Sequence, residues 1–162
     1  MTIHCTNPAE ISPGGFVHLV RKAVERDHAN IIVVDSLNGY MNAMPEEHLL
    51  DSHLHELFSY LRQRGVLTIL TTAQHGMLGN MQTKIDVSYL ADTVILLRYF
   101  EVRGTVRRAI SVVKRRAGDH EKSIRELTIS DSGLHVGDPL TRFQGVLTGV
   151  PQIMDGESLG TS

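Results

Sequence analysis

Asp35 is the acidic residue whose sequence context most favours metal binding. It follows Ile31 to Val34, an unbroken run of β-branched residues. Such a run predicts a parallel strand buried on both faces, and open α/β sheets bind ligands at the carboxyl edges of their strands. A carboxylate at that edge can hold Mg²⁺ through water. The alternative is that Asp35 only caps the turn that follows the strand.

Gln74 stands at the corresponding end of a second apolar run, residues 66–72. An uncharged amide there could sense a terminal phosphate or orient a water molecule. The alternative is that it hydrogen-bonds its own loop. The segment 74–89 that follows is long and contains glycine and methionine, and loops of this length are either functional or disordered.

Lys114 and Arg116 form the strongest cationic feature, at the end of a predicted strand over 107–115. Strand alternation places both on the face of Ile110 and Val112, with Arg115 on the opposite face. Cations that continue an apolar face can reach a buried anion or a subunit boundary, as arginine fingers do. Simple snorkelling of the side chains at a strand end explains the pattern equally well.

The composition narrows the classes of protein that fit. The chain has 162 residues, a formal net charge of −2 and a single Cys5. It lacks the excess cation that nucleic-acid or polybasic membrane binding needs, and it cannot form a cysteine-based zinc cluster. No apolar run approaches a membrane span. We expect a soluble cytoplasmic protein. His48, Asp51 and His55 share one face of a predicted helix, and a solvated surface explains that face better than a metal site.

The order of predicted elements indicates an α/β domain. A helix is predicted to begin at Ser12-Pro13, and another runs from about 45 to 64 and ends at Gly65. Together with strands over 31–35, 66–72 and 93–97 they give a β-α-β-α-β order, which implies a parallel sheet.

The last third of the chain favours antiparallel strands, over 107–115, 124–129 and 134–136, with a turn at 131–133. We expect one domain over residues 1–150 and a flexible tail over 151–162.

Four stretches together resemble the KaiC family of RecA-like ATPases: Ile32 to Leu37, Ala91 to Gly104, Arg108 to Arg116 and residues 124–131. The resemblance extends from about Thr2 to Pro151 and is greatest to the C-terminal part of the second ATPase domain. It implies a partial RecA-like P-loop NTPase core, in which a parallel sheet flanked by helices carries a C-terminal antiparallel β extension.

The resemblance also implies roles for particular residues. Asp35 matches the Walker B aspartate, which holds Mg²⁺ through water. Lys114 and Arg116 match a Lys-x-Arg pair that reaches the terminal phosphate of a neighbouring subunit's ATP. The segment from Gln74 to Tyr89 matches the loop that lines the central channel of the ring.

In the resemblance, Ser88 falls where the circadian clock member of the KaiC family has a phosphorylated serine. Tyr89 stands where that member has a phosphorylated threonine. The implied partners are copies of the same chain in a hexameric ring, a full-length KaiC-like protein, or signalling proteins. The implied cofactors are ATP and Mg²⁺.

The Walker A motif of that family, Gly-x-x-x-x-Gly-Lys-Ser/Thr, does not occur in this sequence. In the family it lies upstream of the Walker B strand, as do the catalytic glutamates. Its strand sits between those that resemble 66–72 and 93–97. Each backbone group that its loss leaves unsatisfied costs roughly 1–3 kcal/mol. We therefore expect that the isolated chain is a fragment, that it re-pairs its strands, or that it borrows an edge from a partner. The chain is then either part of an ATP-hydrolysing ring or a truncated non-catalytic module that binds or caps such rings.

Overall fold

The computed structural model describes residues 2–5, 10–42, 50–73, 88–148 and 151–154. The chain divides into two compact units, residues 1–73 and 74–162. The N-terminal unit contains α1 (Pro13–Glu25), β1 (Ile31–Val34), α2 (Leu37–Asn42), α3 (Leu50–Gln63) and β2 (Leu67–Leu70). The C-terminal unit contains β3 (Thr93–Val102), β4 (Thr105–Arg115), β5 (Arg125–Ser130), β6 (Gly133–Pro139), β7 (Phe143–Gln144), the 3₁₀ helix η1 (Val146–Thr148) and β8 (Gln152–Ile153).

Both predicted helices are confirmed, and their ends have the expected caps. The Ser12 hydroxyl accepts from the Gly15 amide at 3.1 Å, and Pro13 is the first residue of α1. At the end of α3, Gly65 has φ +69°. There the Gly65 amide donates to Arg62 and the Val66 amide donates to Leu61, each at 3.0 Å. This pair of bonds is the Schellman arrangement. The predicted first turn of this helix, residues 45–49, lies outside the described residues.

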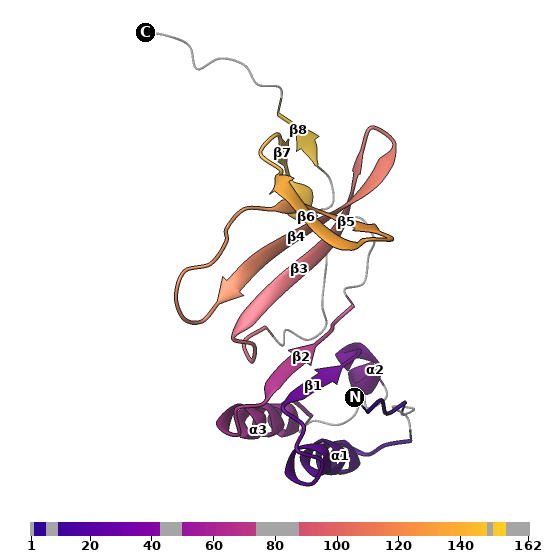
Figure 1. Ribbon diagram of the computed structural model, residues 1–162, viewed down its shortest axis with the longest axis vertical. Coiled ribbons are helices and arrows are strands. Elements are labelled where there is room, and N and C mark those ends of the chain that lie inside the picture. The colour runs from indigo at the N-terminus through magenta and orange to yellow at the C-terminus, as the bar shows by residue number, and fades with distance from the viewer. Residues whose placement is uncertain (1, 6–9, 43–49, 74–87, 149–150, 155–162) are drawn as a thin grey trace. The chain divides into compact units, whose positions relative to one another are not determined.

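The core of the N-terminal unit lies on one side of a two-stranded parallel sheet. β1 pairs with β2 with Ile32 opposite Thr68, and α1 and α3 lie on the same side of this pair (Figure 1). The buried residues of this core are Val20, Leu57, Leu61 and Val66, with Ile32 packed against them.

The prediction that these strands are buried on both faces is wrong for the described residues. The side chains on the other face, Ile31, Val33, Leu67 and Ile69, are 45–59% exposed. Alternation places them opposite the helix-covered face, and no described element of the N-terminal unit covers them.

The C-terminal unit is an antiparallel sheet in the order β3-β4-β5-β6. This confirms the predicted strands over 107–115, 124–129 and 134–136, and β5 and β6 are joined at the predicted turn. Phe100, Ala109 and Val146 are at most 1% exposed and form its core. Figure 1 shows β3 and β4 as the two long strands of this sheet.

The strand predicted over 93–97 belongs to this antiparallel sheet and not to the parallel sheet. β3 pairs with β4 along its whole length, from Thr93 opposite Arg115 to Val102 opposite Thr105. Within the described part of the chain, β2 pairs only with β1, and β3 pairs only with β4. These are the two strands beside which the sequence predicted a missing neighbour.

Strand pairing in the described residues continues to Ile153, because β8 pairs with β7. Residues 155–162 of the predicted tail lie outside the described residues, so the boundary at 150 stays a prediction. Among the residues that the structure describes, no helix is long and apolar enough to cross a membrane.

Candidate functional site

Asp35 lies at the carboxyl end of β1, at the edge of the sheet where the sequence predicted it. Its carboxylate accepts a hydrogen bond from the Thr71 hydroxyl, which follows β2. Two backbone bonds also join these ends: Thr71 donates to Val34, and Leu37 donates to Thr71, each at 3.0 Å. The neighbouring strand therefore orients the exposed carboxylate.

Asn38 adds a second side-chain contact between the segments that follow β1 and β2. Its side-chain amide donates to the Ala73 carbonyl at 2.9 Å, and its side-chain oxygen accepts from the Ala73 amide at 2.7 Å. The two bonds have the pattern of a pair of backbone hydrogen bonds between strands, and they hold Ala73, the residue that precedes Gln74. Gln74 itself lies outside the described residues, so its predicted role remains a prediction.

The sequence reasoning did not identify the contributions of Thr71 and Asn38. A signal for Thr71 was present, because two threonines follow the apolar run of β2 directly. Asn38 had no such local signal, and its contact with Ala73, like that of Thr71 with Asp35, depends on the pairing of β1 with β2.

The donor set at this edge fits Mg²⁺ better than a metal that needs several protein ligands. One Asp35 oxygen is bonded to Thr71, and the other remains for a metal-bound water. Mg²⁺ keeps several waters and is commonly held by one or two carboxylates together with phosphate oxygens. Across the described ranges, no three His, Cys, Asp or Glu side chains gather into a metal site, although His48 of the predicted helix face lies outside them.

Lys114 does not share a face with Ile110 and Val112, so that prediction is wrong. The register between β3 and β4 shifts at a bulge: Ile95 lies opposite Val112, whereas Val94 lies opposite Lys114. The extra residue, Val113, moves Lys114 onto the face that carries Ser111. Strict alternation from the sequence could not reveal an unpaired residue.

Lys114 and Arg116 both bind the turn that precedes β3. The Lys114 ammonium donates to the Ser88 carbonyl at 2.7 Å. The Arg116 guanidinium donates to the Tyr89 carbonyl at 3.1 Å and forms an ion pair with Asp92 at 3.2 Å. Three of the predicted site residues, Ser88, Lys114 and Arg116, are thus brought together in the C-terminal unit. Asp35 belongs to the other unit.

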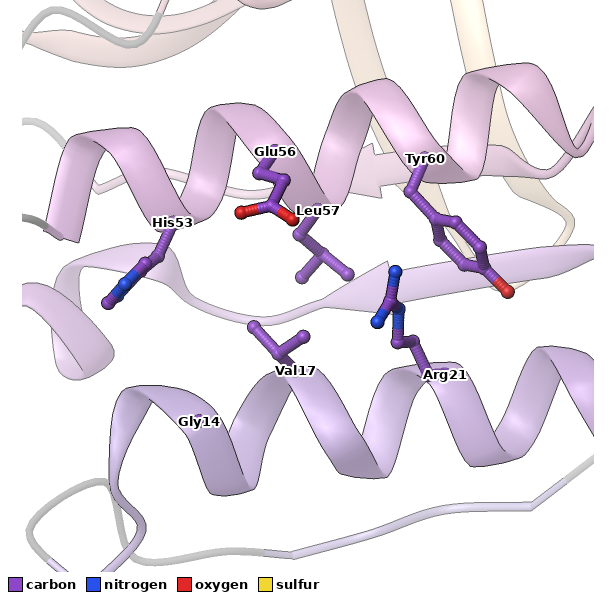
Figure 2. A pocket seen from close by; sticks show the side chains of 7 residues that line it. All are labelled: Gly14, Val17, Arg21, His53, Glu56, Leu57 and Tyr60. Carbon is purple, nitrogen blue, oxygen red and sulfur yellow. The ribbon is translucent and has the colours of Figure 1, made fainter.

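A shallow pocket of about 130 Å³ lies between α1 and α3 (Figure 2). The residues that line it are Gly14, Val17 and Arg21 of α1, and His53, Glu56, Leu57 and Tyr60 of α3.

The polar contacts beside this pocket join the two helices. The Arg21 guanidinium lies 4.6 Å from the centre of the Tyr60 ring. The Tyr60 hydroxyl donates to Glu25 at 2.7 Å, and this bond raises the pKa of Tyr60 because ionisation would remove the donor. We assign these contacts a structural role.

Comparison with known proteins places the chain in a family. The family model described as ATPase: KaiC matches residues 6–141. The chain therefore belongs to the KaiC ATPase family, whose fold is the RecA-like α/β fold.

Three curated proteins illustrate the similarity. The circadian clock protein KaiC3 of Synechocystis is 28% identical over 93% of this chain. The circadian clock oscillator protein KaiC of Thermostichus vulcanus is 25% identical over 93%, and that of Prochlorococcus marinus (strain SARG) is 27% identical over 97%. The chain spans only 30%, 29% and 31% of these three proteins, respectively.

Proposed function

We propose that this chain supplies the Walker B acid and two trans-acting cations to a KaiC-like, ATP-hydrolysing ring. The observation that carries the proposal is the position of Asp35. It is an exposed carboxylate at the carboxyl edge of a parallel strand pair, oriented by Thr71, in a member of the KaiC ATPase family.

Each residue has a defined task in this proposal. Asp35 would hold, through a water, the Mg²⁺ that accompanies ATP, and this ion would supply charge neutralisation to phosphoryl transfer. Lys114 and Arg116 donate to the terminal phosphate held by the neighbouring subunit. Gln74 orients the attacking water. Catalysis of this kind depends on positioning and on electrostatic stabilisation.

The phosphate-binding loop must come from polypeptide outside these 162 residues. Two features of the described residues favour a covering partner: the apolar face formed by Ile31, Val33, Leu67 and Ile69, and the outer edge of β3. Exposed apolar patches and unpaired strand edges are typical association surfaces. The same features favour the second candidate function, a non-catalytic module that binds or caps KaiC-like rings.

Titration calorimetry with Mg·ATP tests whether the chain holds nucleotide by itself. We expect no micromolar binding, because the sequence has no Walker A loop to donate to the β-phosphate. Stoichiometric micromolar binding would exclude the non-binding module and would show that phosphate is held by residues other than those we propose.

Hydrolysis in an assembly that supplies the phosphate-binding loop separates the two candidate functions. Asp35→Asn should lower the rate at least about a hundredfold, because loss of Mg²⁺ organisation removes several kcal/mol of transition-state stabilisation. The matched control is Asp27→Asn, an exposed aspartate between α1 and β1. Equal rates for the two variants favour the capping module.

We also propose that Ser88 is a phosphorylation site. Its carbonyl binds Lys114, so a phosphate on the Ser88 side chain would meet a cation close by. Mass spectrometry of the protein after incubation in the assembly with ATP tests this proposal. Phosphate on Ser88 is the expected result, and its absence under conditions of active turnover is the contrary one.

A further inference from the structure

Lys114 and Arg116 are engaged by the turn Ser88–Asp92, which we call the cation turn. Four bonds make this connection. Two are the side-chain bonds to the carbonyls of Ser88 and Tyr89, at 2.7 and 3.1 Å. The third is the ion pair of Arg116 with Asp92, and the fourth is the Arg116 amide bond to the Asp92 carbonyl at 2.7 Å.

The cation turn is a poor electrostatic match for the two cations. In the contacts just described it offers them two neutral carbonyls and one carboxylate, so these contacts pair only one of the two positive charges with a negative one. The ion pair is also exposed, with 42% of the Arg116 side chain and 54% of the Asp92 side chain accessible to solvent. Ion pairs with this exposure contribute little, and solvent screens them.

A phosphate group matches the same cations better. The bonds to the two carbonyls are already charge-assisted on the donor side, whereas a phosphate oxygen also carries a negative charge and therefore adds a direct attraction between opposite charges. The terminal phosphate of a nucleotide therefore competes with the Ser88 and Tyr89 carbonyls for the same donors.

We propose that the cation turn is a phosphate-operated latch. With no phosphate present, Lys114 and Arg116 hold the turn closed. When a phosphate group binds both side chains, the turn is released, so that occupancy of the phosphate site is transmitted to residues 88–92. This inference rests on the proposed trans role for its biological ligand. The latch itself requires only a phosphate group.

Inorganic tripolyphosphate, added to the complete 162-residue chain, tests the latch without any ring. Two backbone amides report on the turn: Ala91, which donates to Ser88 at 3.2 Å, and Arg116, which donates to Asp92. Tripolyphosphate should speed hydrogen exchange at both by at least about fivefold, as expected for local opening. The Phe143 amide, which donates to Leu140 at 3.2 Å in the same unit, should not change.

Charge-matched variants identify the site. Lys114→Met and Arg116→Met should each weaken tripolyphosphate binding about tenfold or more. Lys122→Met and Arg142→Met remove the same charges elsewhere in the unit and should change binding less than about twofold.

Two results overturn the latch. One is equal binding to all four variants, which would identify a diffuse charge effect. The other is binding that depends on Lys114 and Arg116 while the Ala91 and Arg116 amides keep their exchange rates, which would identify a preformed site. Failure of the proposed ring activity leaves these outcomes unaffected, so the two proposals fail separately.

Discussion

The Lys114 ammonium lies 2.7 Å from the Ser88 carbonyl oxygen, although 26 residues separate them in sequence. The bulge at Val113 produces this contact, because it places Lys114 opposite Val94 at the start of β3. The cation Lys114 and the candidate modification site Ser88 therefore occupy one place in the C-terminal unit.

Replacing Thr71 with valine should destabilise the junction of β1 and β2. Valine keeps the shape of the side chain and removes the hydroxyl that donates to Asp35. We expect the free energy of unfolding to fall by about 0.5–1.5 kcal/mol, measured by urea denaturation. Thr72→Val is the control, at the next position of the same exposed strand end. An equal effect of the two changes would contradict the role given to Thr71.

Gly65 and Gly14 should respond oppositely to alanine. Gly65 has φ +69° at the end of α3, where a β-carbon is strained, so Gly65→Ala should cost about 1–2 kcal/mol. An added β-carbon at Gly14 in α1 meets nothing within 4 Å. Gly14→Ala should therefore stabilise the protein by about 0.4–1 kcal/mol, since it restricts the unfolded chain. Thermal unfolding measures both, and the same sign for the two variants would contradict this account of the helix ends.

Arg107 and Glu126 should show the strongest charge coupling among the ion pairs described in the C-terminal unit. They form two parallel hydrogen bonds between β4 and β5, with side chains only 34% and 24% exposed. The hydrogen bond to Glu126 raises the pKa of Arg107.

A double-mutant cycle with Arg107→Met and Glu126→Gln should give a coupling of about 1 kcal/mol or more. The exposed pair Lys122–Asp119, with side chains 76% and 84% exposed, should give less than about 0.5 kcal/mol. Comparable coupling energies in the two cycles would show that the geometry and burial of Arg107–Glu126 do not make it a stronger ion pair than Lys122–Asp119.

Glu121 should make folding sensitive to acid. Hydrogen bonds from Ser123, and then from Arg125, lower its pKa from 4.5 to about 2. Because the folded-state pKa is depressed, its stabilising contribution is complete above pH 4.5 and disappears as the pH falls toward 2. Carboxyl titration by NMR should show the low pKa directly.

Ser123→Ala removes the hydroxyl donor to Glu121, so the pKa of Glu121 should rise. Ser130→Ala, in which the lost hydroxyl contacts Ser132, should leave it unchanged. An unaltered Glu121 titration in Ser123→Ala would show that the Ser123 hydroxyl is not the main cause of the lowered pKa.

Local sequence patterns predicted the helices and the antiparallel hairpins well. The Ser12 hydroxyl, the ring of Pro13 and the positive φ of Gly65 all act on backbone groups close by in sequence, so these helix ends can be predicted directly from the sequence. The turn before Gly133 has the same property, because glycine supplies the φ of +110° found there.

Long-range pairing could not be predicted in the same way. The apolar run of β3 fits a buried parallel strand, and only its register with β4 shows that it is antiparallel. The exposure of one face of β1 and β2 could likewise not be predicted, because an apolar run does not show which polypeptide covers it. Asp35 was found from its place after a strand, whereas Thr71, Asn38 and the cation turn depend on partners distant in sequence.

The central claim is that Asp35 acts at the site of one subunit while Lys114 acts at the site of its neighbour. Mixing two inactive variants, Asp35→Asn and Lys114→Met, in an assembly that supplies the phosphate-binding loop tests this claim most directly. A ring of heterologous interfaces contains some sites with Asp35 on one side and Lys114 on the other. We predict that an equal mixture recovers roughly a quarter of the wild-type ATPase rate, since random mixing makes about one interface in four complete. A mixture as inactive as each variant alone would contradict the claim.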